Sequence, residues 1–234
     1  MLCAVALFLV LEGVLTVMIQ CERGLAFTRV AFFAVICACL FNLVYCRCGR
    51  VFLITQSALI CTVIADVFLL VLDTGYVVGV SFFIAVQLLY ASWIYTECKS
   101  EGVRRAHLIA RIALTLVALV LPAIILGDRV DLLSTLSIVC FTNLVLNVVF
   151  SFFNFWKDPI LPIALILFML CDAIVGFMNM GAYFSFSEGD LGYYLMRLGA
   201  KGAWLFYAPS QALLAISLLP DWLKKWVAER ENDN

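Results

Sequence analysis

Long uninterrupted apolar runs, separated by short polar stretches, dominate the hydropathy pattern of this chain. Each run approaches the ~20 residues that an α-helix needs to cross the hydrocarbon core of a bilayer. The runs are continuously apolar, whereas lipid-exposed strands of a membrane barrel alternate over about ten residues. The pattern therefore predicts an all-α fold, a polytopic transmembrane bundle of eight helices. The predicted spans are Leu2–Gln20, Leu25–Tyr45, Phe52–Leu72, Tyr76–Tyr95, Leu108–Leu126, Leu132–Phe153, Ile160–Asn179 and Ala203–Leu219.

The spans and their short connections leave no room for a separate soluble domain. We expect residues 1–220 to form a single transmembrane domain and residues 221–234 to form a polar cytoplasmic tail. Ten of the fifteen Lys and Arg residues fall on the side of the membrane that carries both chain ends. Because cytoplasmic loops carry the excess of basic residues, the N and C termini are predicted to be cytoplasmic. The expected location is a bacterial cell membrane or an endoplasmic-reticulum-type membrane.

The composition supports a membrane protein and excludes several other classes. The chain is 65% hydrophobic and 13% charged, against about 45–50% and 25% in soluble domains. A formal net charge of -1 provides no field that would attract nucleic acid. Most of the ten cysteines fall in apolar runs, where they are interpreted as small hydrophobic residues. The single histidine, His107, falls in a basic stretch predicted to be a solvated loop, so it cannot anchor a histidine-rich metal site.

Three carboxylates fall inside the apolar spans: Glu12, Asp66 and Asp172. A charge at the centre of a bilayer costs from ~2.5 kcal/mol upward, so such groups face the bundle interior, pair with a partner or stay protonated. Each is a candidate functional residue. The alternative for any one of them is a neutral acid that hydrogen-bonds within the bundle and serves only the structure.

The surroundings of the second and third of these acids resemble each other. The third span reads LICTVIADVFL over Leu59–Leu69, and the seventh reads LILFMLCDAIV over Leu165–Val175. In both cases the next membrane helix carries a glutamine, Gln87 or Gln211, within a similar aromatic and apolar stretch. Because the third and seventh spans run in the same direction, this indicates a parallel repeat that brings two Asp–Gln sets to similar depths.

Four further side chains are candidate liners of a pocket around these residues. Two tyrosines lie three or four positions from the glutamines and so share their helix faces, and two asparagines are spaced by four on the sixth span. Aromatic packing and interhelical hydrogen bonding are the alternative explanations. The four residues are Tyr90, Tyr207, Asn143 and Asn147.

The two aspartate segments carry a resemblance to a known family. The stretch Ala65–Leu70, followed by Ser81–Tyr90, is similar to the paired signature of the YhhN-like lysoplasmalogenases. Leu170–Asp172 and the aromatic helix that ends at Gln211 resemble the second signature of that family. The number of spans and the chain length agree with it as well.

The resemblance implies a membrane enzyme that hydrolyses the vinyl ether bond of lysoplasmalogens, releasing a fatty aldehyde and a glycerophospho-base. It implies no metal or organic cofactor, and its partners would be a lysophospholipid substrate and the lipid bilayer. Asp66 and Asp172 would correspond to the acidic residues proposed for catalysis in the family. The chain departs from the family pattern at Ala65, where glycine is usual, and at Gln87, where histidine is common.

Two carboxyl groups suit such a reaction because it needs a proton delivered to carbon and a water delivered to an oxocarbenium-like centre. The sequence assigns these two roles to the aspartates jointly.

Two other functions remain open at this point. A proton-coupled secondary transporter would use buried acids and a repeated helix pair, and a non-catalytic membrane protein would use the acids only to lock helices together.

Overall fold

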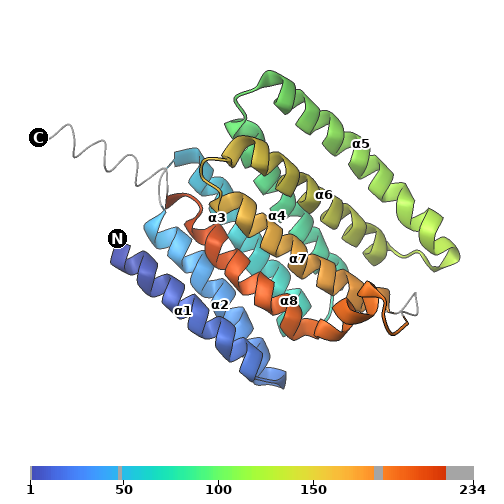
Figure 1. Ribbon diagram of the computed structural model, residues 1–234, viewed down its shortest axis with the longest axis horizontal. Helices are drawn as coiled ribbons and strands as arrows, with labels where there is room; N and C mark the ends of the chain where they lie inside the picture. The colour runs from blue at the N-terminus through green and yellow to red at the C-terminus, as the bar shows by residue number, and fades with distance from the viewer. Residues whose placement is uncertain (1, 47–48, 182–186, 220–234) are drawn as a thin grey trace, which may run out of the picture.

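The computed structural model describes residues 2–46, 49–181 and 187–219, and all regular elements in these ranges are helical (Figure 1). This confirms the predicted all-α bundle of eight helices. The predicted tail, residues 221–234, lies outside the described residues. The long helices are α1 Leu2–Cys21, α2 Gly24–Tyr45, α3 Gly49–Asp66, α4 Tyr76–Glu97, α5 Glu101–Leu126, α6 Leu132–Phe155, α7 Ile160–Met180 and α8 Leu191–Ile216. Two short elements are the π-helix η1, Val67–Val71, and the 3-10 helix η2, Gly127–Arg129.

Seven of these helices are long and apolar enough to cross a membrane. They present large apolar side chains to the outside of the bundle, for example Leu7 at 71%, Ile124 at 74% and Phe153 at 67% exposure. Apolar surface on this scale is unfavourable in water and is what lipid solvates. The chain is therefore an integral multi-pass membrane protein.

The remaining helix, α8, contains most of the predicted eighth span but is not among the seven helices that are long and apolar enough to cross a membrane. It packs against α1, α2, α3 and α7 (Figure 1). These neighbours bury most of its residues from Ala203 to Ile216. A helix in this position can carry polar residues that would be costly on the lipid-facing surface.

Successive helices run in alternating directions, so the start of α1 and the end of α8 lie at the same end of the bundle (Figure 1). This agrees with the prediction that both termini lie on one side of the membrane. The assignment of that side to the cytoplasm rests on the distribution of basic residues and stays a prediction.

The prediction for the start of the fifth helix was wrong. The helix α5 begins at Glu101, seven residues before the predicted start at Leu108. The side-chain oxygen of Ser100 caps it by accepting a hydrogen bond from the backbone N–H of Val103 at 3.4 Å. His107 consequently lies inside a helix and is only 2% exposed, so it is not in a solvated loop. The predicted span was bounded by the apolar run and so started after the charged stretch 101–105. The helix itself includes that stretch.

The predicted start of the last helix, Ala203, was also too late. The helix α8 begins at Leu191 and contains one non-helical residue, Gly199, with φ 62° and ψ -168°. An L-residue with a side chain would be strained at this φ, so glycine is required at the break. The aromatic and charged composition of residues 191–202 concealed the fact that they form the first part of α8.

Candidate functional site

Asp66 is the last residue of α3, and a rare change of helical type follows it directly. The backbone of η1 widens to a π-helix, in which the N–H of Leu72 donates to the carbonyl oxygen of Val67 at 2.8 Å. The N–H of Thr74 then donates to the carbonyl oxygen of Phe68 at 3.1 Å. Such wide turns interrupt the α-helical ladder and occur frequently at functional sites.

The carboxyl group of Asp66 is buried against α8. The phenol hydroxyl of Tyr207 donates to Oδ2 of Asp66 at 2.9 Å, and the exposed fractions of the two residues are only 4% each. Aromatic rings surround the tyrosine: Trp204 at 4.9 Å, Phe168 at 5.6 Å and Phe83 at 6.4 Å between ring centroids. These apolar walls exclude water from three sides of the hydrogen bond and strengthen it.

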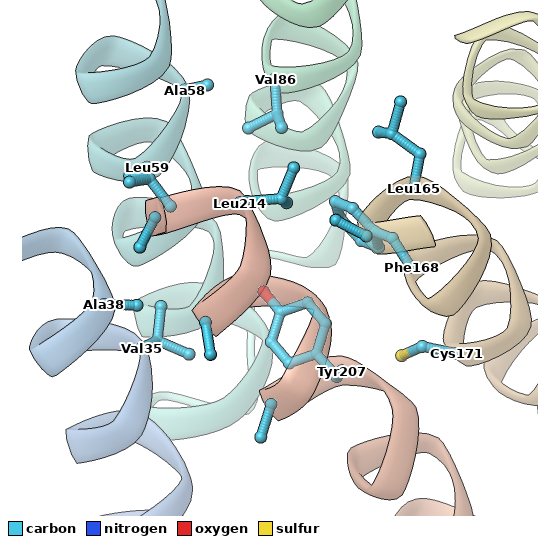
Figure 2. Close-up of a cluster of buried hydrophobic side chains, with 14 of the residues drawn as sticks. Val35, Ala38, Ala58, Leu59, Val86, Leu165, Phe168, Cys171, Tyr207 and Leu214 are labelled. Atoms are coloured by element: carbon cyan, nitrogen blue, oxygen red, sulfur yellow. The ribbon is translucent and has the colours of Figure 1, made fainter. Parts of the chain in front are cut away.

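Figure 2 shows how Tyr207 reaches this position. Its ring lies near the middle of the buried cluster, with residues of α2 and α3, such as Val35 and Leu59, on one side. Residues of α7, Phe168 and Cys171, lie on the other side. The central helix α8 thus presents a polar group to α3 from within an apolar core.

The second aspartate approaches the same region from α7. Asp172 is half-buried, and its carboxyl group lies within electrostatic range of Asp66. The buried thiol of Cys171 interacts with both acids, and the thiol of Cys140 on α6 interacts with Asp172. The structure therefore brings together Asp66, Asp172 and Tyr207, three of the residues singled out in the sequence.

The two carboxyl groups have different environments. Asp66 is enclosed by aromatic and aliphatic side chains and has one hydrogen-bond donor, whereas Asp172 is partly exposed. Pairs of acids in unequal surroundings are the arrangement by which enzymes divide proton donation and proton acceptance between two carboxyl groups. The arrangement can therefore support acid–base chemistry on a bound molecule.

Gly79 of α4 packs against the π-helix that follows Asp66. A Cβ at this position would lie 2.5 Å from Cγ of Leu69. We expect Gly79→Ala to displace Leu69 and to destabilise the protein by about 1–3 kcal/mol, the usual cost of overpacking. Unfolding of the purified protein by SDS in mixed micelles measures this difference.

Gly176 on α7 is the matched control for that substitution. A Cβ at Gly176 meets no atom within 4 Å, so Gly176→Ala should be neutral or stabilising by roughly 0.5–1 kcal/mol through helix propensity. Equal stability of the two alanine variants would contradict a tight contact between α4 and η1.

Other predicted liners lie near the site or one turn away from it. Gln211 follows Tyr207 by four residues on α8, and neither its amide nitrogen nor its amide oxygen has a partner among the described residues. Tyr90 is fully buried and interacts electrostatically with Cys39 and Cys61, which places it toward α2 and α3. The hydroxyl of Tyr90 also has no hydrogen-bond partner in the described part of the chain. Buried polar groups usually have such partners, so a bound group or a shift of neighbouring side chains would have to supply them.

Three predicted liners instead belong to a second polar cluster around Arg111 of α5. Its guanidinium donates to Oδ1 of Asn143 at 2.6 Å and to Oδ1 of Asn147 at 2.7 Å, and its Nε donates to Nε2 of His107 at 3.3 Å. Nδ2 of Asn147 then donates to Oε1 of Gln87 at 3.0 Å. These five residues, which we call the Arg111 cluster, join α4, α5 and α6.

The sequence pattern indicated two of these three helices but not Arg111. Arg111 is one of the ten basic residues assigned to the cytoplasmic side, and His107 was predicted to lie in a loop. One signal could have found them: His107, Arg111 and Thr115 recur every four residues, and so do Asn143 and Asn147 on the next helix. Two polar stripes with this spacing face each other in an antiparallel helix pair.

Glu12, the third acid inside a predicted span, is on α1, which carries none of the residues of the two polar groups described above. It is 3% exposed, and its Oε1 has no hydrogen-bond partner in the described part of the chain. It interacts electrostatically with Cys37 of α2.

Comparison with protein-family models, curated proteins and solved structures gives no match to this chain, and no family is identified in this way.

Proposed function

We propose that this chain is a membrane-embedded hydrolase that cleaves the vinyl ether bond of lysoplasmalogens, with Asp66 and Asp172 as its acid and base. The observation that carries the proposal is that two carboxyl groups from different spans lie within electrostatic range of each other, one of them hydrogen-bonded to Tyr207 at 2.9 Å. Two acids in unequal surroundings within a lipid-embedded body suit a reaction on a lipid substrate.

The reaction needs proton transfers in two stages, hydration of the vinyl ether and breakdown of a hemiacetal, and two carboxyl groups can supply them. One carboxylic acid gives its proton to the outer vinyl carbon, and the carbon bonded to the ether oxygen becomes an oxocarbenium centre. Water adds to that centre and loses a proton to the other group, a carboxylate, which yields a hemiacetal. The hydroxyl of the hemiacetal then gives its proton to the first group, now a carboxylate, and the second group protonates the glycerol oxygen. The carbon–oxygen bond to glycerol breaks, a fatty aldehyde and the glycerophospho-base are released, and both carboxyl groups return to their starting states. Positioned acid and base groups contribute about 10²–10⁴-fold to such steps.

One polar side chain on the same helix as Tyr207 supports a place for the water molecule. Gln211 lies one helical turn from Tyr207 on the same face of α8, and both ends of its amide have no partner among the described residues. An amide can donate to and accept from one water, and the water would then lie close to the carboxyl groups. Gln211 is therefore assigned to water and substrate positioning.

The substrate class rests on the resemblance given by the two signature segments. Ala65–Leu70 and Ser81–Tyr90 make up the first, and Leu170–Asp172 with the helix through Gln211 makes up the second. The two aspartates of these segments are the two that approach each other, which supports using the resemblance for the choice of substrate.

The decisive test compares three lysolipids that differ only in the bond at the first glycerol carbon. The purified protein is incubated with vinyl ether, ester and alkyl ether forms, and fatty aldehyde and fatty acid are quantified. Aldehyde from the vinyl ether alone is expected. Fatty acid from the ester would instead indicate a lysophospholipase, and no product from any of them would refute a hydrolase.

Tyr207→Phe tests the role of the hydroxyl group that contacts Asp66. The substitution removes the donor and leaves the aromatic packing with Phe168 and Trp204 in place. We expect a roughly tenfold decrease in kcat for aldehyde release, corresponding to ~1.4 kcal/mol of lost stabilisation in the transition state. Trp204→Phe serves as the control, because it changes a neighbouring ring and keeps the hydroxyl. An equal decrease in both variants would indicate packing as the cause.

A proton-coupled transporter is the second candidate, because two helices near the acids are interrupted. The π-helix η1 follows Asp66, and Gly199 breaks α8 eight residues before Tyr207. Interrupted helices around intramembrane acids are typical of transport sites. Proton-driven uptake of a lysolipid into proteoliposomes without chemical conversion would favour transport over hydrolysis.

A further inference from the structure

The Arg111 cluster contains a cation within a membrane helix, and its partners there are all neutral. Arg104 and Arg105 pair with Glu101 near the start of the same helix, and Arg111 forms no ion pair with the residues that the structure describes. Its partners are two asparagine oxygens and an imidazole nitrogen. An intramembrane cation without a counter-ion is costly and is a default indicator of function.

The cluster has more hydrogen-bond donors than acceptors. The Oδ1 atoms of Asn143 and Asn147 accept from Arg111, and Oε1 of Gln87 accepts from Asn147, so these three oxygens are occupied. Nε2 of Gln87 has no acceptor in the described part of the chain. Gln87 is fully buried, and an unpaired donor in that position is costly.

His107 adds a second donor without an acceptor. Because its Nε2 accepts a hydrogen bond from Nε of Arg111, the ring hydrogen belongs on Nδ1. Nδ1 has no partner within the described ranges, and the ring is held in place by stacking on Phe150 at 4.5 Å between centroids. A positive charge with two unpaired buried donors calls for a negatively charged group with several acceptor oxygens.

Helix α6 connects the Arg111 cluster to the acid pair. Cys140 on α6 interacts electrostatically with Asp172. Asn143 and Asn147 follow it by three and seven residues, about 5 and 10 Å along the helix and on the same face. The glycerol backbone of a lysophospholipid separates its phosphate from the bond at its first carbon by a comparable length.

We propose that the Arg111 cluster is the subsite for the phosphate group of the lysophospholipid, with the guanidinium of Arg111 as its cation. The assignment of this phosphate to a substrate rests on the proposed function. Arg111 is half-buried on α5 and is the partly exposed member of the cluster, whose other four residues are buried. A planar guanidinium pairs with two phosphate oxygens at once, which a lysine cannot do.

Binding of two ether lipids that share one alkyl chain tests the proposal. The first is a 1-O-alkyl lysophospholipid, which carries the phosphate but lacks the vinyl ether, and the second is the 1-O-alkylglycerol, which lacks the phosphate. We expect Arg111→Gln to raise the Kd of the first by at least tenfold and to leave that of the second unchanged. Arg111→Lys should weaken binding of the first lipid by a smaller factor, because lysine keeps the positive charge but cannot donate two parallel hydrogen bonds to the phosphate.

Arg105→Gln is the matched control, because Arg105 lies on the same helix with 75% of its side chain exposed and pairs with Glu101 instead of the cluster. It should bind both lipids as the wild type does. Equal effects of Arg111→Gln on both lipids, or on neither, would overturn the proposal, and so would an equal loss in the Arg105 variant. Each variant is first checked for monodisperse elution and native helix content, and the lysine variant carries the test if the glutamine variant does not fold.

Inorganic phosphate distinguishes the two sources of the phosphate group. Displacement of the alkyl lysophospholipid by millimolar phosphate from the wild type would assign the site to free phosphate, and no displacement would assign it to the lipid.

The proposed function can fail separately from the proposed phosphate subsite. Phosphate-dependent lipid binding without aldehyde release would refute the hydrolase and leave the subsite in place. Aldehyde release with an unchanged KM in Arg111→Gln would refute the subsite alone.

Discussion

Asp66→Asn is expected to lower the rate of aldehyde release by about 10²–10⁴-fold while the protein stays folded, because the amide can neither deliver nor accept the proton. Asparagine has nearly the same shape, and its side-chain oxygen can still accept the hydrogen bond from Tyr207 that Asp66 accepts at 2.9 Å. Aldehyde released per minute from the vinyl ether lysolipid, measured in a detergent in which both proteins elute as single species, gives the ratio directly.

Asp172→Asn should have an effect of the same order, because the two acids share the chemistry. Asp73→Asn is the control: it is the same chemical change seven residues from Asp66, at an exposed position with a φ of 49° that asparagine readily adopts. It should keep full activity. Full activity in either of the other two variants would refute the two-aspartate mechanism.

Asn147→Leu is expected to be the most destabilising single substitution in the Arg111 cluster. Asn147 is fully buried, accepts from Arg111 at 2.7 Å, and donates to the backbone oxygen of Gln87 at 2.8 Å and to its Oε1 at 3.0 Å. Leucine has nearly the same volume but leaves these groups unpaired, at about 1–3 kcal/mol for each buried group. We expect a loss of roughly 3 kcal/mol, measured by SDS-induced unfolding in mixed micelles.

Asn179→Leu is the control for that measurement. Asn179 is exposed near the end of α7, and its side chain donates only to the carbonyl oxygen of Val175 in its own helix. Its replacement should change the stability by less than ~0.5 kcal/mol, as is usual for surface positions. A similar loss in both variants would indicate that the bundle is sensitive to any asparagine replacement, with no special role for the cluster.

The sequence predicted the helices well because a bilayer requires long apolar helices and leaves few alternatives. It was less accurate where the requirement is weaker. The start of α5 at Glu101 and of α8 at Leu191 lie outside the apolar runs, where capping by Ser100 and a turn before Asp190 decide the boundary. Apolar content alone could not locate them.

The candidate site was predicted in part. Asp66 and Asp172 stood out because a carboxyl group inside an apolar run is costly and therefore informative. The contact between Tyr207 and Asp66 depends on the rotation of α8 about its axis, which short-range spacing does not determine. Arg111 was missed for a different reason: a basic residue near the end of an apolar run is usually solvated at the membrane surface, and only the three-dimensional structure shows that it turns inward.

The central position of α8 has a consequence for biosynthesis. The ribosome makes this helix after the seven that surround or flank it, and α1, α2, α3 and α7 all use it as a packing partner. Until α8 is inserted, the nascent bundle holds an uncovered seam along its middle, which lipid tails or a membrane insertase must fill. Completion of the core is therefore a late event, and Asp66 gains the hydrogen bond from Tyr207 only when α8 arrives.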